Sequence, residues 1–362
     1  MNSSNANLKR FWSPKVHDLS PYVPGEQPKL TNLVKLNTNE NPFPPSPKVF
    51  VAIQNQLNQS LRLYPDPNAT KLRQCLADST GLKIDNVFVG NGSDEVLAHT
   101  FQALLQHSEP LLFPDISYSF YPVYCGLYGI KKCEVPLSED LTINVSDFSQ
   151  PNGGVILPNP NAPTGELLSL MDIRQLLMAN SNRVVVIDEA YIDFGGQSAA
   201  QLVPEFDNLL VVQTLSKSRS LAGLRVGFAL GQSHLIEALE RVKNSFNSYP
   251  LSSESQAGAI AAIEDVSYFQ ETCQANIVQR EKLAGQLKSL GFSMTQSRAN
   301  FLFVTHEAMG AKEIAGALRE QGIIVRHLTN SPRISNYLRI SVGSATECDL
   351  LVQALTVLVS GS

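Results

Sequence analysis

The sequence predicts an α/β protein with a largely parallel sheet covered by helices on both faces, together with a smaller α+β domain. Two observations predict the first part. Between about residues 46 and 260, short apolar runs typical of buried strands alternate with stretches of helical periodicity, and polar motifs repeatedly follow the strands. Such alternation is typical of parallel sheets with crossover helices. After about residue 265 the character changes to a long helical stretch followed by short strands, which predicts the second domain.

The predicted elements divide the chain into three parts. Residues 1–45 are expected to form an N-terminal arm and part of the small domain, residues 46–262 the large domain, and residues 263–362 the small C-terminal domain. Prolines interrupt any helix in the arm, whereas Ser46-Pro47 pairs a cap with a proline and begins a helix. Along the chain, apolar runs predict strands at 86–89, 111–113, 154–157, 184–187, 208–214, 301–304, 323–325 and 338–340, and helical periodicity predicts helices at 93–106, 169–179, 266–290, 311–321 and 347–358.

The composition is that of an ordinary globular protein and excludes several classes. A net charge of −5 argues against a nucleic acid or an anionic membrane as partner. No apolar run approaches the roughly 20 residues that span a bilayer, and the first residues lack the apolar core of a secretory signal. A cytoplasmic location is therefore expected. The five cysteines form no C-x-x-C pair and the six histidines lack metal-ligand spacing, so we expect neither a disulfide framework nor a metal.

Polar motifs follow the predicted strands of the large domain. The motif GNGSDE covers residues 90–95 and NPNAPTG covers 159–165, while Asp188 and the pair Ser216-Lys217 each follow a further apolar run. Ligands of parallel sheets collect outside the carboxyl ends of the strands. The sequence therefore predicts that these motifs meet in one site.

Three of these positions indicate a particular cofactor. Lys217 can form a Schiff base with a carbonyl group, and Ser216 with Arg225, eight positions after the lysine (225 − 217 = 8), can hold a phosphate. Asp188 ends a buried strand, so its carboxylate should have a cationic partner such as a protonated pyridine nitrogen. A lone lysine is usually a solvated surface residue, but this combination predicts a site for pyridoxal 5′-phosphate.

Other residues fit that cofactor, each with an ordinary alternative. Tyr191 can donate to the phenolic oxygen of the ring, or simply pack in the core. Tyr118 can stack on the pyridine face, although core burial explains it nearly as well. Backbone N–H groups of Ser93, Asp94 and Glu95 at a helix start can form a phosphate nest.

Two arginines of the predicted small domain also suggest an anion site. Arg326 lies in IIVRHL and Arg339 in YLRISVG, each within a strand of apolar residues. A surface arginine is the usual interpretation. An arginine between buried strand positions more often needs an anion, and its planar fork suits a carboxylate or a phosphate.

With these residues assembled, the chain resembles the fold-type I pyridoxal-phosphate aminotransferases and, among them, the histidinol-phosphate aminotransferase family. That family's fold is a three-layer α/β/α large domain with a mostly parallel sheet, plus a smaller α+β domain. The similarity covers nearly the entire chain in the family's order, through the motifs DLSPYVPGEQP, LNTNENP, YPDP, GNGSDE, SYSFY, PNAPTG, IDEAYIDF, TLSKSRSLAGLRVGF, GIIVR and YLRISVG.

The resemblance implies roles for the cofactor-binding residues. Lys217 carries the cofactor, Asp188 pairs with the ring nitrogen and Tyr191 lies at the phenolic oxygen. The phosphate is held by Ser93, Ser216 and Arg225, with Tyr64 of the partner subunit.

It also implies a substrate site shared between subunits. Arg339 binds the substrate carboxylate and, with Arg326 and Tyr22 of the partner subunit, the phosphate of histidinol phosphate. Asn39 of LNTNENP is expected at the substrate as well. Because sites are shared, the resemblance implies an obligate homodimer.

One position departs from the family. The asparagine that usually precedes Pro-Thr-Gly and contacts the phenolic oxygen is Ala162 here. Either Asn161 replaces it or Tyr191 makes that contact alone, and we favour Asn161.

The implied reaction is amino transfer between L-histidinol phosphate with 2-oxoglutarate and imidazole-acetol phosphate with L-glutamate. An aromatic amino-acid aminotransferase or a decarboxylase of a phosphorylated amino acid would need the same arginines and remains an alternative. A non-catalytic module on this fold is a further alternative, which the presence of Lys217, Asp188 and Arg225 disfavours.

Overall fold

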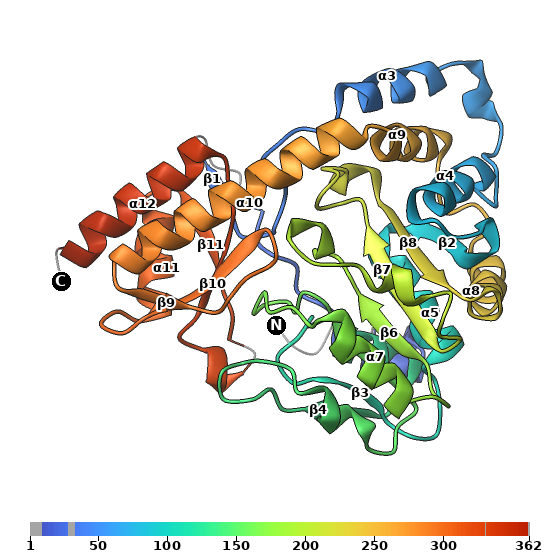
Figure 1. Ribbon diagram of the computed structural model, residues 1–362, viewed down its shortest axis with the longest axis horizontal. Helices are drawn as coiled ribbons and strands as arrows, with labels where there is room; N and C mark the ends of the chain where they lie inside the picture. Colours follow the sequence, from blue (N-terminus) through green and yellow to red (C-terminus); the bar gives the residue numbers. More distant parts are fainter. Residues whose placement is uncertain (1–8, 28–32, 330, 361–362) are drawn as a thin grey trace.

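The computed structural model describes residues 9–27, 33–329 and 331–360. Residues 1–8, 28–32, 330 and 361–362, which belong to the predicted arm and small domain, lie outside these ranges. The described chain is built around two β-sheets of seven and five strands. The sheets lie side by side in Figure 1, and the long helix α10 (Val266–Ser289) runs past both.

The seven-stranded sheet is largely parallel. Its order is β2-β8-β7-β6-β5-β3-β4, with β8 antiparallel to both of its neighbours and the other pairs parallel. The carboxyl ends of β2, β5, β6 and β7 therefore meet at one edge, as the sequence predicts. The strands are β2 (Val87–Asn91), β3 (Leu111–Pro114), β4 (Lys132–Val135), β5 (Gly154–Pro158), β6 (Val185–Asp188), β7 (Leu209–Thr214) and β8 (Val226–Gly231).

Helices cover both faces of this sheet. Successive strand residues point to opposite faces, so Val186 of β6 packs in one layer whereas Val185 and Ile187 pack in the other. This three-layer arrangement confirms the predicted α/β class. Val186 faces α5 (Gly92–Leu104), α6 (Tyr121–Tyr128) and α8 (Ser233–Phe246), and the opposite layer contains α3 (Pro47–Gln56), α4 (Thr70–Thr80), α7 (Leu170–Ala179) and α9 (Ser253–Glu264).

The five-stranded sheet combines the two ends of the chain. Its order is β1-β11-β12-β10-β9, and β1 pairs in parallel with β11 while the other pairs are antiparallel. Helices α10, α11 and α12 pack on one face. On the other face Phe303 contacts Ile116 and Leu137 of the large sheet's loops. The elements are β1 (Val34–Leu36), β9 (Phe292–Met294), β10 (Phe301–His306), β11 (Ile323–His327), β12 (Leu338–Ser341), α11 (Ala311–Glu320) and α12 (Ala345–Ser360).

Local capping explains where the predicted helices begin. Ser46 accepts a hydrogen bond from the Lys48 N–H at 3.2 Å, ahead of the proline that starts α3. Ser169 and Asp172 cap each other's backbone N–H at 3.2 and 3.0 Å, which begins α7. Four strands were not predicted: β1, β4, β8 and β9. β1, β4 and β9 are short edge strands, and β8 directly follows the loop that carries the lysine and arginine motifs.

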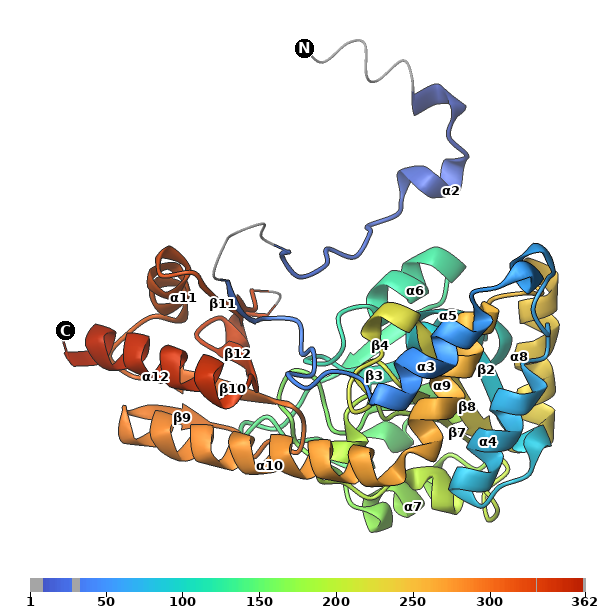
Figure 2. The same ribbon diagram turned by 90° about the horizontal axis from the view of Figure 1, so that it is seen from above.

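The first part of the described N-terminal segment, residues 9–17, extends away from the two sheets. Figure 2 shows α2 (Pro14–His17) far from the remaining helices, and neither it nor η1 contains a buried residue. The predicted domain boundaries stay predictions, and the one at 262/263 falls in the last turn of α9. The 3₁₀ helices are η1 (Lys9–Phe11), η2 (Gln59–Arg62), η3 (Ile84–Asn86), η4 (Val145–Ser149), η5 (Ile192–Phe194), η6 (Ala199–Leu202), η7 (Ala222–Leu224) and η8 (Pro332–Ile334).

Candidate active site

A cavity of about 430 Å³ lies where the carboxyl edge of the large sheet meets the small sheet. Its wall is formed by the segments that leave β2, β5, β6 and β7, by the start of β8, by the N-terminal segment and by β11 and β12. The structure brings most of the predicted site residues together here. They are Tyr22, Asn39, Ser93, Asp94, Tyr118, Asp188, Tyr191, Ser216, Lys217, Arg225, Arg326 and Arg339.

Lys217 projects its amine into this cavity from the turn after β7. Its Nζ donates to the Thr38 carbonyl oxygen at 3.2 Å and lies 5.8 Å from the centre of the Tyr191 ring. The Asn41 side chain donates to the Lys217 carbonyl at 2.9 Å and fixes the turn. The amine thus has a neutral acceptor and an aromatic face beside it.

Asp188 is a buried carboxylate with one unused oxygen. Its Oδ2 accepts a hydrogen bond from the Tyr121 hydroxyl at 2.8 Å, whereas Oδ1 is buried and has no hydrogen-bond partner among the described residues. Burial raises the pKa of Asp188 to about 6 against the lowering effect of the Tyr121 hydrogen bond, and the charge of Asp94 raises it further. A cationic partner at Oδ1 would relieve this cost.

The opposite end of the cavity carries Arg225 and the start of α5. Arg225 Nη2 donates to Asp94 Oδ2 at 3.0 Å, and backbone N–H groups of a helix start attract anions. The Ser216 hydroxyl accepts from Thr214 Oγ1 at 3.0 Å, which leaves its own proton available to donate. A cation, a hydroxyl and a helix start are suited to hold a phosphate.

Strand β8 and the start of α5 approach too closely for a side chain between them. Gly227 pairs with Gly90 in the antiparallel ladder. A Cβ at Gly227 would overlap the Ser93 backbone nitrogen and the Gly92 carbonyl carbon. The glycine therefore allows the helix start to be pressed against the strand next to Arg225.

The Tyr118 ring lines the same wall and is held at its hydroxyl. Its hydroxyl donates to Asp94 Oδ1 at 3.0 Å, so Asp94 joins Tyr118 to Arg225. Burial, followed by the charge of Asp94, raises the pKa of Tyr118 well above its ordinary value. The hydroxyl therefore stays protonated and can keep donating to Asp94.

Two arginines face each other at the small-sheet side of the cavity. Arg326 of β11 and Arg339 of β12 are direct partners in an antiparallel ladder, where like charges repel. Arg339 Nη2 donates to the Asn37 carbonyl at 3.0 Å, and its buried Nε has no partner among the described residues. Burial, and secondarily the charge of Arg326, lowers the pKa of Arg339. An anion in the cavity would relieve both effects.

Asn39 links the cavity to the small sheet. Its Nδ2 donates to the Tyr191 hydroxyl at 2.9 Å, and its Oδ1 accepts from the Ser341 hydroxyl at 3.0 Å. Its backbone has a left-handed φ of 55°, which asparagine tolerates better than most residues. Asn39 therefore orients Tyr191 from a fixed position.

The geometry agrees with the result of comparison with known proteins. A family model described as aminotransferase class I and II matches residues 31–355. This chain belongs to the class I and II aminotransferases. The predicted family is thereby confirmed, and the cavity described above is the candidate active site of an aminotransferase.

The similarity to known proteins extends over nearly the whole chain. The histidinol-phosphate aminotransferase of Pseudomonas putida is 60% identical over 349 residues, which cover 96% of this chain and 100% of that protein. Histidinol-phosphate aminotransferase 1 of Methylococcus capsulatus is 61% identical over 354 residues, which cover 98% of this chain and 99% of that protein. The crystal structure of the Sinorhizobium meliloti histidinol-phosphate aminotransferase in complex with pyridoxal-5′-phosphate matches with a TM-score of 0.86 at 23% identity, over 97% of this chain and 98% of that one. The predicted fold-type I architecture is confirmed.

Three predicted site residues of this aminotransferase do not line the cavity. Asn161 is fully buried and its amide donates to the Ile116 carbonyl at 3.1 Å and to Thr164 Oγ1 at 3.0 Å. Ala162 lines the cavity instead, so the geometry does not support the prediction that Asn161 replaces the missing asparagine. Glu95 Oε2 accepts from the Asn91 N–H at 2.6 Å and caps α5. Tyr64 is 82% exposed.

Tyr22 differs from prediction in another way. It was expected from the partner subunit, yet Tyr22 lines the cavity of its own chain. Its ring packs 4.8 Å from that of Phe120 and 6.5 Å from that of Tyr118. The N-terminal segment returns past the cavity after the protruding α2, which brings Tyr22 to this position without a second chain.

Several further residues at the site are not indicated by any sequence pattern. Thr38 and Glu40 also line the cavity, and their only signal was membership of the irregular segment LNTNENP. Tyr121 contacts Asp188 across 67 positions of sequence, and no local pattern indicates such a pair.

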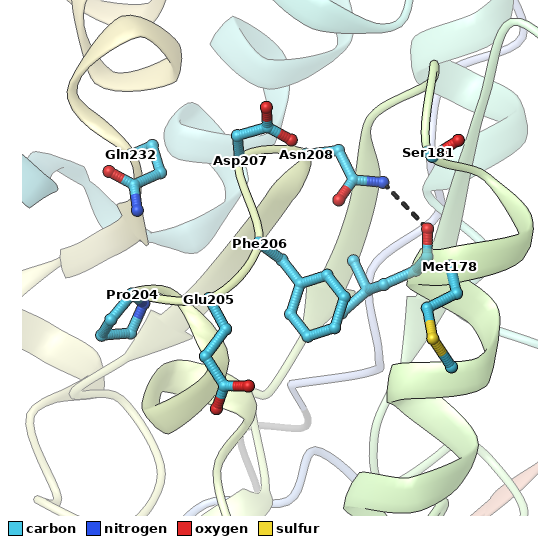
Figure 3. Close-up of a pocket in the computed structure, with 9 residues that line it drawn as sticks. Met178, Ser181, Pro204, Glu205, Phe206, Asp207, Asn208 and Gln232 are labelled. Atoms are coloured by element: carbon cyan, nitrogen blue, oxygen red, sulfur yellow. Dashed lines mark hydrogen bonds between the residues drawn. The ribbon is translucent and has the colours of Figure 1, made fainter.

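A second cavity, of about 440 Å³, lies at the amino ends of β6 and β7. Figure 3 shows Met178 and Phe206 in its wall beside Asn208, whose amide donates to the Leu177 carbonyl at 3.2 Å. It contains none of the predicted site residues. Within the described ranges, no helix is long and apolar enough to cross a membrane, and no group of three or more metal-ligating side chains occurs.

Proposed function

We propose that this aminotransferase interconverts L-histidinol phosphate plus 2-oxoglutarate and imidazole-acetol phosphate plus L-glutamate in histidine biosynthesis, with pyridoxal 5′-phosphate as cofactor. The observation that carries this proposal is one cavity that combines Lys217, the free oxygen of Asp188 and the opposed Arg326 and Arg339. Identities of 60% and 61% to relatives named for this activity support the substrate.

The residues of the cavity fit pyridoxal phosphate. The unpartnered Oδ1 of Asp188 suits a protonated ring nitrogen, and the Tyr118 ring offers a flat surface for stacking. Arg225, Ser216 and the start of α5, pressed close by Gly227, suit the phosphate. When bound, this cofactor supplies a carbonyl carbon that reacts with amines and a ring that accepts an electron pair.

The side chains of this chain then perform defined tasks. The Lys217 amine moves the proton at the α-carbon of the substrate, because no other amine lines the cavity among the described residues. Asp188 holds a proton on the ring nitrogen. The Tyr191 hydroxyl accepts a hydrogen bond from Asn39, so its own proton is free to be donated into the cavity, towards the phenolic oxygen. With Asn161 turned away, Tyr191 makes that contact alone.

The opposed arginines suit both substrates. Arg339 and Arg326 can bind the phosphate of histidinol phosphate, and the side-chain carboxylate of glutamate can occupy the same place. Each substrate would remove the repulsion between the two cations. A single anion site used in turn by two substrates agrees with a ping-pong reaction.

The absorption spectrum of the purified protein tests this proposal. We expect a yellow band that bleaches with L-histidinol phosphate and recovers with 2-oxoglutarate, and that is absent from Lys217→Ala, which should also lose turnover. Bleaching by aromatic amino acids alone would assign the protein to the aromatic aminotransferases, and release of carbon dioxide would indicate a decarboxylase. A protein that takes up no pyridoxal phosphate would refute the assignment.

We further propose that the active form is a homodimer with shared sites. Tyr64 does not line the cavity of its own chain; its exposed ring stacks on Tyr249 at 4.6 Å between ring centres. The role at the cofactor phosphate that the resemblance implies for Tyr64 would therefore be performed in the cavity of a second chain. Exposed apolar side chains occur on α3, along the segment that leads from α3 to Tyr64, and at residues 11 and 12 of the protruding N-terminal segment, which supports a surface that a partner covers. They include Phe11, Trp12, Phe50, Val51, Leu57, Leu61 and Leu63. The cytoplasmic location remains a prediction.

A further inference from the structure

Tyr121 lies directly behind the cavity, at the first position of α6. Its side chain is fully buried, and its ring packs edge-on against the Tyr118 ring at 5.6 Å and near the Phe113 ring at 5.8 Å. Its hydroxyl donates to Asp188 Oδ2 at 2.8 Å. Tyr121 therefore touches two residues that line the cavity without lining it itself.

This hydrogen bond gives the two carboxylate oxygens of Asp188 different roles. With Oδ2 held by Tyr121, the carboxylate cannot rotate without losing a buried hydrogen bond, which is costly for both partners. Oδ1 is then the oxygen left over, and it is buried without a partner among the described residues. The strand register fixes the backbone beneath it, since Asp188 pairs with Pro158 on one side and Val212 on the other.

We propose that Tyr121 is a positioning residue for the cofactor: its hydroxyl holds Oδ2 of Asp188 so that the ionised Oδ1 is presented to the ring nitrogen. This inference rests on the proposed function, because it requires pyridoxal phosphate in the cavity. Charge-assisted hydrogen bonds stabilise an ionised carboxylate in a buried site. Without the hydroxyl, the carboxylate would be both freer to rotate and harder to keep charged.

The same tyrosine connects the two contacts that the ring would make. Tyr118 is tied at its hydroxyl to Asp94 and supported from behind by Tyr121, and Asp188 is tied to Tyr121. The buried Tyr121 side chain thus positions both the Tyr118 ring, on which the cofactor ring would stack, and the Asp188 carboxylate, which the nitrogen of the cofactor ring would meet. Only the contact with Asp188 depends on the hydroxyl of Tyr121. Replacement of Tyr121 by phenylalanine therefore separates that role from the support of Tyr118.

The test compares the affinity of cofactor-free Tyr121→Phe and wild-type protein for two ligands. One is pyridoxal 5′-phosphate and the other is its 1-deaza analogue, in which a carbon replaces the ring nitrogen. We expect the variant to bind pyridoxal phosphate about tenfold more weakly or worse, as for loss of a hydrogen bond to a charged group, and to bind the analogue as well as the wild type does. The measurement is an equilibrium titration and does not depend on turnover.

Tyr124→Phe is the matched control. Tyr124 lies on the same helix, is almost as buried, and donates to the Asp94 carbonyl at 2.8 Å rather than to Asp188. Its removal should affect the two ligands equally. Equal weakening of both ligands by Tyr121→Phe would reduce Tyr121 to a packing residue and overturn the proposal, as would unchanged affinity for pyridoxal phosphate. Wild-type protein that binds neither ligand would instead refute the proposed function.

Discussion

At the scale of single residues, the candidate site is a set of groups that the protein leaves unsatisfied. Asp188 Oδ1 and Arg339 Nε are buried and have no partner among the described residues, and Arg326 faces Arg339 across a ladder. Each arrangement costs stability in the absence of a ligand. Such costs are tolerated where a ligand removes them, which is why they indicate binding rather than poor packing.

The pKa of Asp188 allows this cost to be measured. Because burial raises its pKa in the folded state to about 6, above its ordinary value in an unfolded chain, the folded protein holds this proton more tightly. Its contribution to stability is present below the ordinary pKa and is lost as pH rises through about 6. Asp188→Asn carries no charge, so the cofactor-free variant should become more stable than wild type as pH rises from about 4 to 7, by up to about 3 kcal/mol.

Thermal unfolding of both cofactor-free proteins at several pH values checks this expectation. The exposed Asp207→Asn serves as control and should show no such trend. With pyridoxal phosphate added, the order should reverse, since only the wild type gains the ion pair. A stability difference that does not change with pH would contradict the argument.

At the scale of elements, two segments shape the site through residues that do not themselves line the cavity. The first is the contact of β8 with the start of α5. Gly227→Ala would force Ser93 and Gly92 away from the strand, because a Cβ has no space there. We expect a loss of roughly 1–3 kcal/mol of stability and weaker binding of pyridoxal phosphate.

Gly285→Ala is the matched control for that substitution. Gly285 lies in α10, and a Cβ there would meet nothing within 4 Å. Alanine in a helix interior should stabilise the protein by up to about 1 kcal/mol. Equal effects of the two substitutions on cofactor affinity would show that the close approach at Gly227 does not matter for binding.

The second segment is the loop of residues 159–165, where Asn161 is structural. Its amide supports the Ile116 carbonyl and Thr164, so Asn161→Ala should destabilise the protein by about 1–3 kcal/mol. The absorption spectrum with pyridoxal phosphate should stay that of the wild type, because the side chain does not reach the cavity. A shifted band in the folded variant would restore the prediction that Asn161 contacts the phenolic oxygen.

At the scale of the whole molecule, local sequence patterns predicted the strands and the polar residues at their ends, but not which distant segments pair with one another. The strand exits that carry Ser93, Asp188 and Lys217 were predictable because each follows its own apolar run. The antiparallel direction of β8 was not, since strand direction depends on partners distant in sequence. Likewise Asn39 contacts Ser341 across 302 positions, and only the fold brings them together. The position of Tyr22 in its own chain's cavity was missed for the same reason.

The proposed sharing of active sites between subunits makes a prediction that belongs to the assembled molecule. Lys217→Ala should abolish activity. Tyr64→Ala should severely reduce it when pyridoxal phosphate is limiting. In a hybrid dimer, the subunit that keeps Lys217 would receive Tyr64 of the partner subunit, so one of the two sites is intact. If subunits assort at random, half of the dimers are hybrids, and co-expression should restore about a quarter of wild-type activity.

Co-expression of Lys217→Ala with Arg225→Ala is the matched control, because both residues line one chain's cavity and no intact site can form. If hybrids isolated by two affinity tags stayed as inactive as that control, Tyr64 would not complete the partner's site.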